Sequence, residues 1–206
     1  MKSRPPASSG RDEYLELVLV RHGHALGGPM NGNPKLGAGL TALGRRQAAR
    51  VAKRLARERF DRIYSSDATR AHETAQAIVK HHRRTPFALH REFREIMTYH
   101  NRGDRRPPKG SRPLFLRQRK SLDAFLPRFL RRHRPGQRVL LVCHGQLIQF
   151  LISYLAGVNP RRSVPIHIHN TAVTQLFVHL PQGRLMFDRG VGYANCVKHL
   201  LPSQQT

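Results

Sequence analysis

Arginine and histidine residues follow three apolar runs of the sequence, each at the point where a strand is expected to end. They are Arg21 and His22 after residues 15–20, Arg70 after residues 62–65, and His144 after residues 138–143. In open α/β sheets, ligands bind beyond the carboxyl ends of the strands, where helix N-termini present free N–H groups. If these strands are neighbours, two guanidinium groups and two imidazoles converge, and such a group suits a tetrahedral dianion such as phosphate.

Each of these residues also has a structural interpretation. A histidine after a strand is most often a hydrogen-bonded structural residue, and an arginine in the first turn of a helix, such as Arg70, is often merely solvated. The chain contains 13 His, so two could fall near strand ends by chance. Two of the runs are followed by a His-Gly pair, at 22–23 and 144–145, with arginines nearby. Chance is a less satisfactory explanation of this repeated pattern.

The three runs also indicate the fold class. They are nearly continuous in Val and Leu, which is typical of strands covered on both faces in a largely parallel sheet. Helical patterns fill the gaps between them, and alternating strands and helices predict a layered α/β fold. We therefore expect a three-layer sandwich, with a mostly parallel central sheet and helices on both faces, in one domain over residues 14–202 after a basic leader over residues 1–13.

Four helices and one hairpin are expected at particular places. The first helix should run from the cap Thr41 to Arg59, and Ser66 or Asp67 should cap the second. The third should carry Leu122 to Leu130, with Pro127 as a kink or break, and the fourth should run from Gln146 to Ala156 with Gly157 as its C-cap. Near the end of the chain, residues 173–180 and 184–187 flank Pro181-Gln182-Gly183, a pattern that predicts a hairpin.

Charge is the most unusual feature of the composition. The 206 residues include 37 Lys+Arg and 12 Asp+Glu, which gives a net charge of +25. Such a surface attracts anions and would bind polyanions by counterion release, although a crowd of solvated arginines is the simpler explanation. No apolar run reaches the length of a membrane span, and no secretory signal is evident. Cys143 ends an apolar run and is expected to be a packed thiol, so we expect a cytoplasmic protein.

Several separated motifs together resemble the histidine phosphatase (phosphoglycerate-mutase-like) superfamily. Leu19-Val20-Arg21-His22-Gly23 resembles its Arg-His-Gly signature, and the segments 40–48, 64–75, 142–145 and 169–174 are similar to later family motifs in the same order and spacing. The resemblance covers roughly residues 15–176. It implies the phosphoglycerate-mutase-like fold and a metal-independent phosphatase of the histidine acid type, a phosphoric monoester hydrolase without a cofactor.

The resemblance also implies a role for each matching residue. His22 would attack phosphorus and carry it as phosphohistidine, while Arg21, Arg70, His144 and Gly145 would bind the phosphoryl oxygens. Elementary chemistry agrees, because a nucleophilic imidazole must be neutral and adjacent guanidinium groups disfavour its protonated form. Fixed cations aimed at the spreading charge are the main catalytic contribution in phosphoryl transfer, so no metal is required if these groups suffice.

A leaving alkoxide needs a proton, which the family obtains from a glutamate beyond the second helix. Glu92 and Glu95 are both candidates, and Phe93-Arg94-Glu95-Ile96 resembles the family's Leu-Arg-Glu-Ile, which favours Glu95 as the general acid. The alternative is that both glutamates pair with surrounding arginines on the surface. Residues 90–120 would form an acid-bearing segment and a basic lid, although a solvated loop is the simplest explanation of residues 101–119.

Three other functions remain open at this point. One is a phosphoglycerate-mutase-type phosphotransferase, which usually has additional segments. Another is a metal site at the pairs His22/His24 or His167/His169, which lacks a Cys or carboxylate shell. The third is a nucleic-acid-binding module on the same scaffold, which lacks aromatics interleaved with its basic stretches. A phosphatase acting on a phosphorylated small molecule or a phosphoprotein is favoured.

Overall fold

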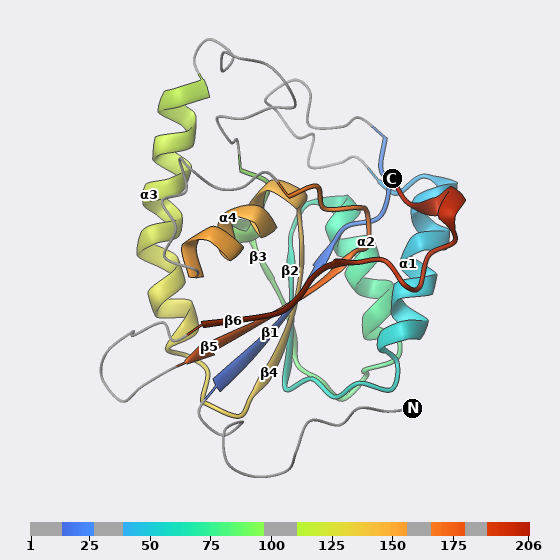
Figure 1. Ribbon diagram of the computed structural model, residues 1–206, viewed down its shortest axis with the longest axis horizontal. Helices are drawn as coiled ribbons and strands as arrows, with labels where there is room; N and C mark the ends of the chain where they lie inside the picture. Colours follow the sequence, from blue (N-terminus) through green and yellow to red (C-terminus); the bar gives the residue numbers. More distant parts are fainter. Residues whose placement is uncertain (1–13, 27–38, 97–110, 156–165, 180–188) are drawn as a thin grey trace.

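The computed structural model describes residues 14–26, 39–96, 111–155, 166–179 and 189–206 (Figure 1). Within these ranges the helices and strands are, in chain order, β1 (Tyr14–Arg21), α1 (Ala42–Leu55), β2 (Arg62–Ser66), α2 (Thr69–Val79), β3 (Phe87–His90), α3 (Ser111–Leu130), β4 (Arg138–Cys143), α4 (Gly145–Leu155), β5 (Val173–His179) and β6 (Arg189–Cys196). Two short 3-10 helices, Arg91–Phe93 and Pro202–Gln204, complete them.

The strands form one sheet in the order β3-β2-β4-β1-β5-β6. The first four of these positions pair in parallel, whereas β5 runs antiparallel to β1, and β6 runs antiparallel to β5. The three apolar runs of the sequence are therefore neighbouring strands, and the prediction of a mostly parallel α/β sheet is confirmed.

Helices cover both faces of the sheet, as expected for a three-layer sandwich (Figure 1). Val18 and Val20 of β1 pack in a cluster with residues of α1 and α2. Leu17 and Leu19, which alternate with them and point to the opposite face, pack with residues of α3 and α4. A strand buried on both faces explains why its sequence is apolar without alternation.

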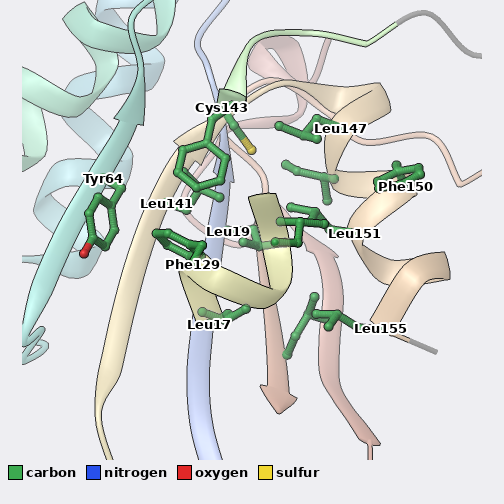
Figure 2. Packing of buried hydrophobic residues seen from close by; sticks show 14 of the residues in the cluster. Leu17, Leu19, Tyr64, Phe129, Leu141, Cys143, Leu147, Phe150, Leu151 and Leu155 are labelled. Atoms are coloured by element: carbon green, nitrogen blue, oxygen red, sulfur yellow. The ribbon is translucent and has the colours of Figure 1, made fainter. Parts of the chain in front are cut away.

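Helix α4 is anchored by a stripe of leucines. Leu147, Leu151 and Leu155 follow one another at a spacing of four and pack on the sheet beside Leu19 (Figure 2). Burying a leucine side chain stabilises a fold by about 1.5–3 kcal/mol. The N-terminus of α4 is consequently fixed beside the carboxyl end of β4.

The register of the parallel strands brings their carboxyl ends to one level. Arg21 lies opposite Cys143 in the β1–β4 pair, and Ser65 lies opposite Val142 in the β2–β4 pair. The residues that follow these three strands consequently emerge at the same edge of the sheet, as the sequence predicted.

Two helix boundaries differ from the prediction. Thr41 caps α1 and its hydroxyl accepts the N–H of Gly44 at 3.0 Å, but the helix ends at Leu55 and not at Arg59. The chain turns there because Phe60 is buried at the approach to β2. The cap residue of α2 is Ala68 and neither Ser66 nor Asp67, although the Ser66 hydroxyl accepts the Ala68 N–H at 3.2 Å.

The third helix is longer than expected. Helix α3 begins at Ser111, so residues 111–119 are helical and do not belong to an irregular loop. Phe115 is buried and extends the apolar face of the helix toward its N-terminus, which the charged neighbours concealed. Pro127 lies inside the helix and does not end it. The remainder of the predicted lid, residues 97–110, lies outside the described residues.

The described chain ends in an antiparallel pair of strands and a short 3-10 helix. Strand β6, which the structure describes from Arg189, pairs with β5, and the predicted second strand at residues 184–187 lies outside the described residues. Helix α4 runs from Gly145 to Leu155, and its predicted cap Gly157 lies, like residues 180–188, outside the described part. Cys143 is a buried free thiol, as predicted. Among the described residues, no helix has the length and apolarity needed to cross a membrane.

Candidate active site

His22 lies immediately beyond β1 and is almost fully buried, with 7% of its surface exposed. Its Nδ1 lies 2.7 Å from the carbonyl oxygen of Gly23. Because a carbonyl only accepts, Nδ1 must carry the ring proton. Arg70 Nε donates to His22 Nε2 at 3.1 Å, which requires a lone pair on that nitrogen. The surroundings of His22 thus select a neutral imidazole whose free nitrogen is Nε2.

Arg70, in the first turn of α2, links the two histidines of the sequence motif. It is 5% exposed, and while Nε contacts His22, a terminal nitrogen donates to Nδ1 of His144 at 3.1 Å. His144 Nε2 then carries the proton and donates to the hydroxyl of Ser66 at 2.9 Å. The two imidazole rings lie edge to face with their centroids 5.0 Å apart. One guanidinium group therefore holds two unprotonated ring nitrogens.

Arg21 joins this group from the end of β1. Its guanidinium group donates to the carbonyl oxygen of Ile168. The side chain passes beside Gly145, where an added Cβ atom would lie 3.3 Å from Arg21 Nε. Gly145 also begins α4, so the backbone of that helix end approaches the arginine closely.

Electrostatics favour the neutral form of both imidazoles. Burial lowers the pKa of His22 well below its ordinary value, and the positive charges of Arg21 and Arg70 lower it further. Burial likewise lowers the pKa of His144, assisted by the neighbouring His22 and Arg70. A buried, neutral imidazole beside fixed cations is the state that a nitrogen nucleophile requires.

The structure distinguishes the two glutamates that the sequence left open. Glu95 is half-buried, and its carboxylate accepts the N–H of Leu147 at 3.1 Å at the start of α4. Burial raises the pKa of Glu95, while the Leu147 N–H and the charge of Arg21 oppose that shift. Glu92 points elsewhere and lies 3.4 Å from Arg91 and 3.6 Å from His90. Only Glu95 of this pair lies within electrostatic reach of Arg21.

The remaining histidines of the sequence analysis have other surroundings. His24 Nδ1 lies 2.9 Å from the hydroxyl of Thr41, so this ring contacts the cap of α1. His167 and His169 lie outside the strands, and their ring centroids are 4.5 Å apart. Over the described residues, no three His, Cys, Asp or Glu side chains gather in an arrangement that could hold a metal ion.

The sequence analysis assigned no role to two sets of supporting residues, although Gln47, Thr74 and Asn170 lie in its motif segments. Ser66 orients His144, and a serine at the carboxyl end of an apolar run was the available signal. Thr74, Gln47 and Asn170 bind the backbone of residues 22–24, and no local pattern predicts these contacts. Thr174 in β5 accepts the N–H of Asn195 and lies outside this set.

Fold and site together define an α/β protein with an imidazole–guanidinium cluster at its strand ends. The family model of the histidine phosphatase superfamily (branch 1) matches residues 17–105 and 97–186. The serine/threonine-protein phosphatase Pgam5 of Caenorhabditis briggsae is 30% identical over 178 residues, which are 80% of this chain and 59% of that protein. The chain belongs to the histidine phosphatase superfamily, and it spans about 59% of the length of this curated relative.

Solved structures show the same fold. YhfR of Bacillus stearothermophilus is 25% identical, with a TM-score of 0.66 over 90% of this chain and 98% of that one. The phosphoserine phosphatase of Entamoeba histolytica is 22% identical, with a TM-score of 0.66 over 91% of this chain and 100% of that one. The phosphoglycerate-mutase-like fold expected from the motifs is thereby confirmed.

Proposed function

We propose that this chain is a phosphomonoester hydrolase that forms a phosphohistidine intermediate on His22. The observation that carries the proposal is the buried contact of Arg70 with Nε2 of His22 and Nδ1 of His144, both at 3.1 Å. The lone pair of the nucleophile faces the same guanidinium group that would bind a phosphoryl oxygen. The nucleophile and the anion-binding groups therefore lie next to each other in the same site.

The first chemical step is a transfer of the phosphoryl group to nitrogen. His22 Nε2 attacks phosphorus as the bond between phosphorus and the ester oxygen breaks, and protonated Glu95 gives its proton to the leaving oxygen. Water then attacks the phosphohistidine, and its proton returns to Glu95 as inorganic phosphate forms and His22 regains its lone pair. Burial raises the pKa of Glu95, which favours the protonated form that the first step needs.

Charge stabilisation in this mechanism comes from the side chains of the chain itself. Arg70 contacts both imidazoles, and Arg21 passes beside Gly145. These two arginines and His144 would bind the oxygens of the transferring group, and Arg70 would exchange its contact with His22 Nε2 for one with an oxygen before that nitrogen attacks. Fixed donors that need no reorganisation are the largest contribution to catalysis of this kind. We infer that activity does not depend on a metal ion.

The substrate is proposed to be a phosphorylated small molecule or a phosphoprotein. Pgam5 is named as a serine/threonine-protein phosphatase, which supports an alkyl phosphate ester with a poor leaving group. A phosphoglycerate-mutase-type phosphotransferase uses the same nucleophile and differs in its acceptor. Incubation of the labelled enzyme with water alone and with 3-phosphoglycerate separates the two, because only a phosphotransferase passes the label to the second hydroxyl.

Hydrolysis of an aryl phosphate with excess chelator tests the proposal. The wild-type enzyme should hydrolyse it at the same rate with and without chelator, and His22→Ala should be inactive. His81→Ala, at an exposed histidine, is the matched control and should retain full activity. Retained hydrolysis in His22→Ala, or loss of wild-type activity on chelation, would contradict the mechanism.

A second candidate function, polyanion binding, is supported by helix α1. Arg46, Arg50 and Lys53 recur at spacings of four and three residues, are exposed, and share one face of the helix. The helix contains no acidic residue, and in the described part of the chain no ion pair involves these three. Like charges at such spacing destabilise a helix by a few tenths of a kcal/mol per pair, whereas the phosphates of a nucleic acid would neutralise them.

Binding of a DNA duplex at several salt concentrations tests this second function. Reversal of the stripe (Arg46→Glu, Arg50→Glu, Lys53→Glu) should reduce the slope of log K against log[salt] by about three times 0.9. The control reverses exposed Arg128, Arg131 and Arg132 and changes the net charge equally. Equal losses in both variants would mean that net charge alone attracts DNA and that α1 is no specific surface.

A further inference from the structure

Two buried amide side chains hold the backbone of the nucleophile's loop at two points. Asn170, with 4% of its surface exposed, donates from Nδ2 to the carbonyl oxygen of His22 at 2.8 Å. Gln47, with 0% exposed, accepts the N–H of His24 on Oε1 at 2.7 Å. A carbonyl needs a donor and an N–H needs an acceptor, so these two contacts fix the orientation of both amides.

Thr206 joins the two amides to each other. Gln47 Nε2 lies 3.1 Å from the hydroxyl of Thr206 and 2.6 Å from the carbonyl oxygen of Gln204. The same hydroxyl donates to Asn170 Oδ1 at 3.1 Å. A directed chain of hydrogen bonds therefore runs from the His24 N–H through Gln47, Thr206 and Asn170 to the carbonyl of His22. We call these three side chains the loop bridge.

The loop bridge acts on the ring of His22 through one peptide plane. The N–H of His24, which Gln47 binds, and the carbonyl of Gly23, which accepts the His22 Nδ1 proton at 2.7 Å, belong to the same peptide group. Because a peptide group is planar, rotation of this plane would break both contacts together. Donation from its N–H also polarises the carbonyl and makes it a better acceptor.

We propose that the loop bridge of Gln47, Thr206 and Asn170 is a positioning device that keeps His22 in the tautomer with its lone pair on Nε2. The inference rests on the proposed function of His22 and assigns the bridge no contact with substrate. It differs from ordinary core packing because Thr206 is exposed, so its hydroxyl contributes the link between the amides and little buried surface. Removal of the Thr206 hydroxyl therefore tests the positioning of His22 with little change in the packing of the core.

Gln47→Met and Thr206→Val test the proposal in the 206-residue chain. Each keeps the approximate volume of the side chain and removes its hydrogen bonds. The matched controls are Gln175→Met, which loses one contact with Glu16, and Thr85→Val, which loses one contact with the Phe60 carbonyl. Both controls break hydrogen bonds of the same type away from His22.

Two readouts distinguish positioning from a loss of folded protein. In Gln47→Met the kcat for an aryl phosphate should fall about tenfold or more with KM within about twofold, because a small misplacement of a reacting group reduces the rate while the phosphate-binding arginines are intact. Nitrogen NMR of the His22 ring should show mainly the Nδ1–H tautomer in the wild type and a mixture in Gln47→Met, with a smaller change in Thr206→Val. Thermal melting of each variant measures the folded fraction.

The outcomes separate this inference from the proposed function. If the wild type forms phosphohistidine and both bridge variants match their controls in kcat and tautomer, the bridge has no positioning role. If the wild type forms no phosphohistidine, the proposed function fails, while the NMR comparison still decides whether the bridge sets the tautomer. If Gln47→Met does not fold, Thr206→Val alone decides, and an unchanged tautomer and kcat there would overturn the proposal.

Discussion

Arg70→Lys is the substitution that examines the shared guanidinium group most sharply. The change keeps the positive charge but replaces a planar fork with a single ammonium group. Arg70 uses two different nitrogens to contact His22 and His144, both at 3.1 Å. An ammonium on a flexible chain does not reproduce both contacts with the same geometry, so the anion site loses its arrangement while the net charge is unchanged.

The expected loss of activity depends on how many of the hydrogen-bond donors of Arg70 are displaced. Removal of one preorganised donor to a developing anion reduces kcat by about 10²- to 10³-fold, or ~2.7–4 kcal/mol. Arg70 is 5% exposed, so water does not readily replace the lost contacts. We expect Arg70→Lys to fall in this range for kcat/KM. Arg62 is the exposed first residue of β2, and Arg62→Lys serves as the control with little expected change.

Steady-state and single-turnover kinetics with an aryl phosphate measure the loss, and thermal melting verifies that the variant is folded. A folded Arg70→Lys enzyme with kcat/KM within threefold of the wild type would refute the reasoning. Charge alone would then suffice at this position, and the double contact with the imidazoles would have no catalytic consequence.

The remaining predictions concern the acid, a buried histidine and a close backbone contact. Glu95→Gln should reduce kcat about 10²-fold for an alkyl phosphate but little for an aryl phosphate, and Glu92→Gln should affect neither; an equal loss on both esters would move the acid elsewhere. Burial lowers the pKa of His133, which is 4% exposed. Below about pH 6.5 the unfolded chain therefore binds more protons at this residue than the folded chain does. The contribution of His133 to stability is complete above that pH and declines as the pH falls, by up to about 1.4 kcal/mol per pH unit. His133→Phe should reduce the difference in unfolding free energy between about pH 7.5 and about pH 5.5, measured by urea titration. A difference equal to that of the wild type would contradict the prediction. Gly44→Ala would place a Cβ atom 2.0 Å from the His24 carbonyl oxygen, and we expect a loss of ~1–3 kcal/mol in unfolding free energy together with reduced activity; a neutral effect would show that α1 shifts freely.

The sheet and the convergence of the site could be predicted because both depend on strong local patterns. The runs that became β1 and β4 are apolar on both faces, and parallel strands end at one edge, which places His22 and His144 together. Helix ends were less predictable, because the end of α1 is decided by the burial of Phe60 and not by a local stop signal. Strand β6 contains Gly190 and Gly192 and gave little strand signal, so the sequence did not predict it.

Contacts between distant segments were beyond sequence reasoning. Glu92 and Glu95 are three residues apart and chemically identical; a family resemblance favoured Glu95, but its contact with the α4 N-terminus could be seen only in the fold. Gln47 and Thr206 lie 159 residues apart, and neither carries a pattern that pairs it with the other. Such partners are set by the completed fold.

Rapid-quench trapping with a radiolabelled phosphate ester tests the central claim most directly. The account predicts a covalent adduct that forms faster than turnover, is labile in acid and stable in base, maps to His22, and is absent in His22→Ala. A wild-type enzyme that hydrolyses the ester with no such adduct, or with label on another residue, would contradict the account.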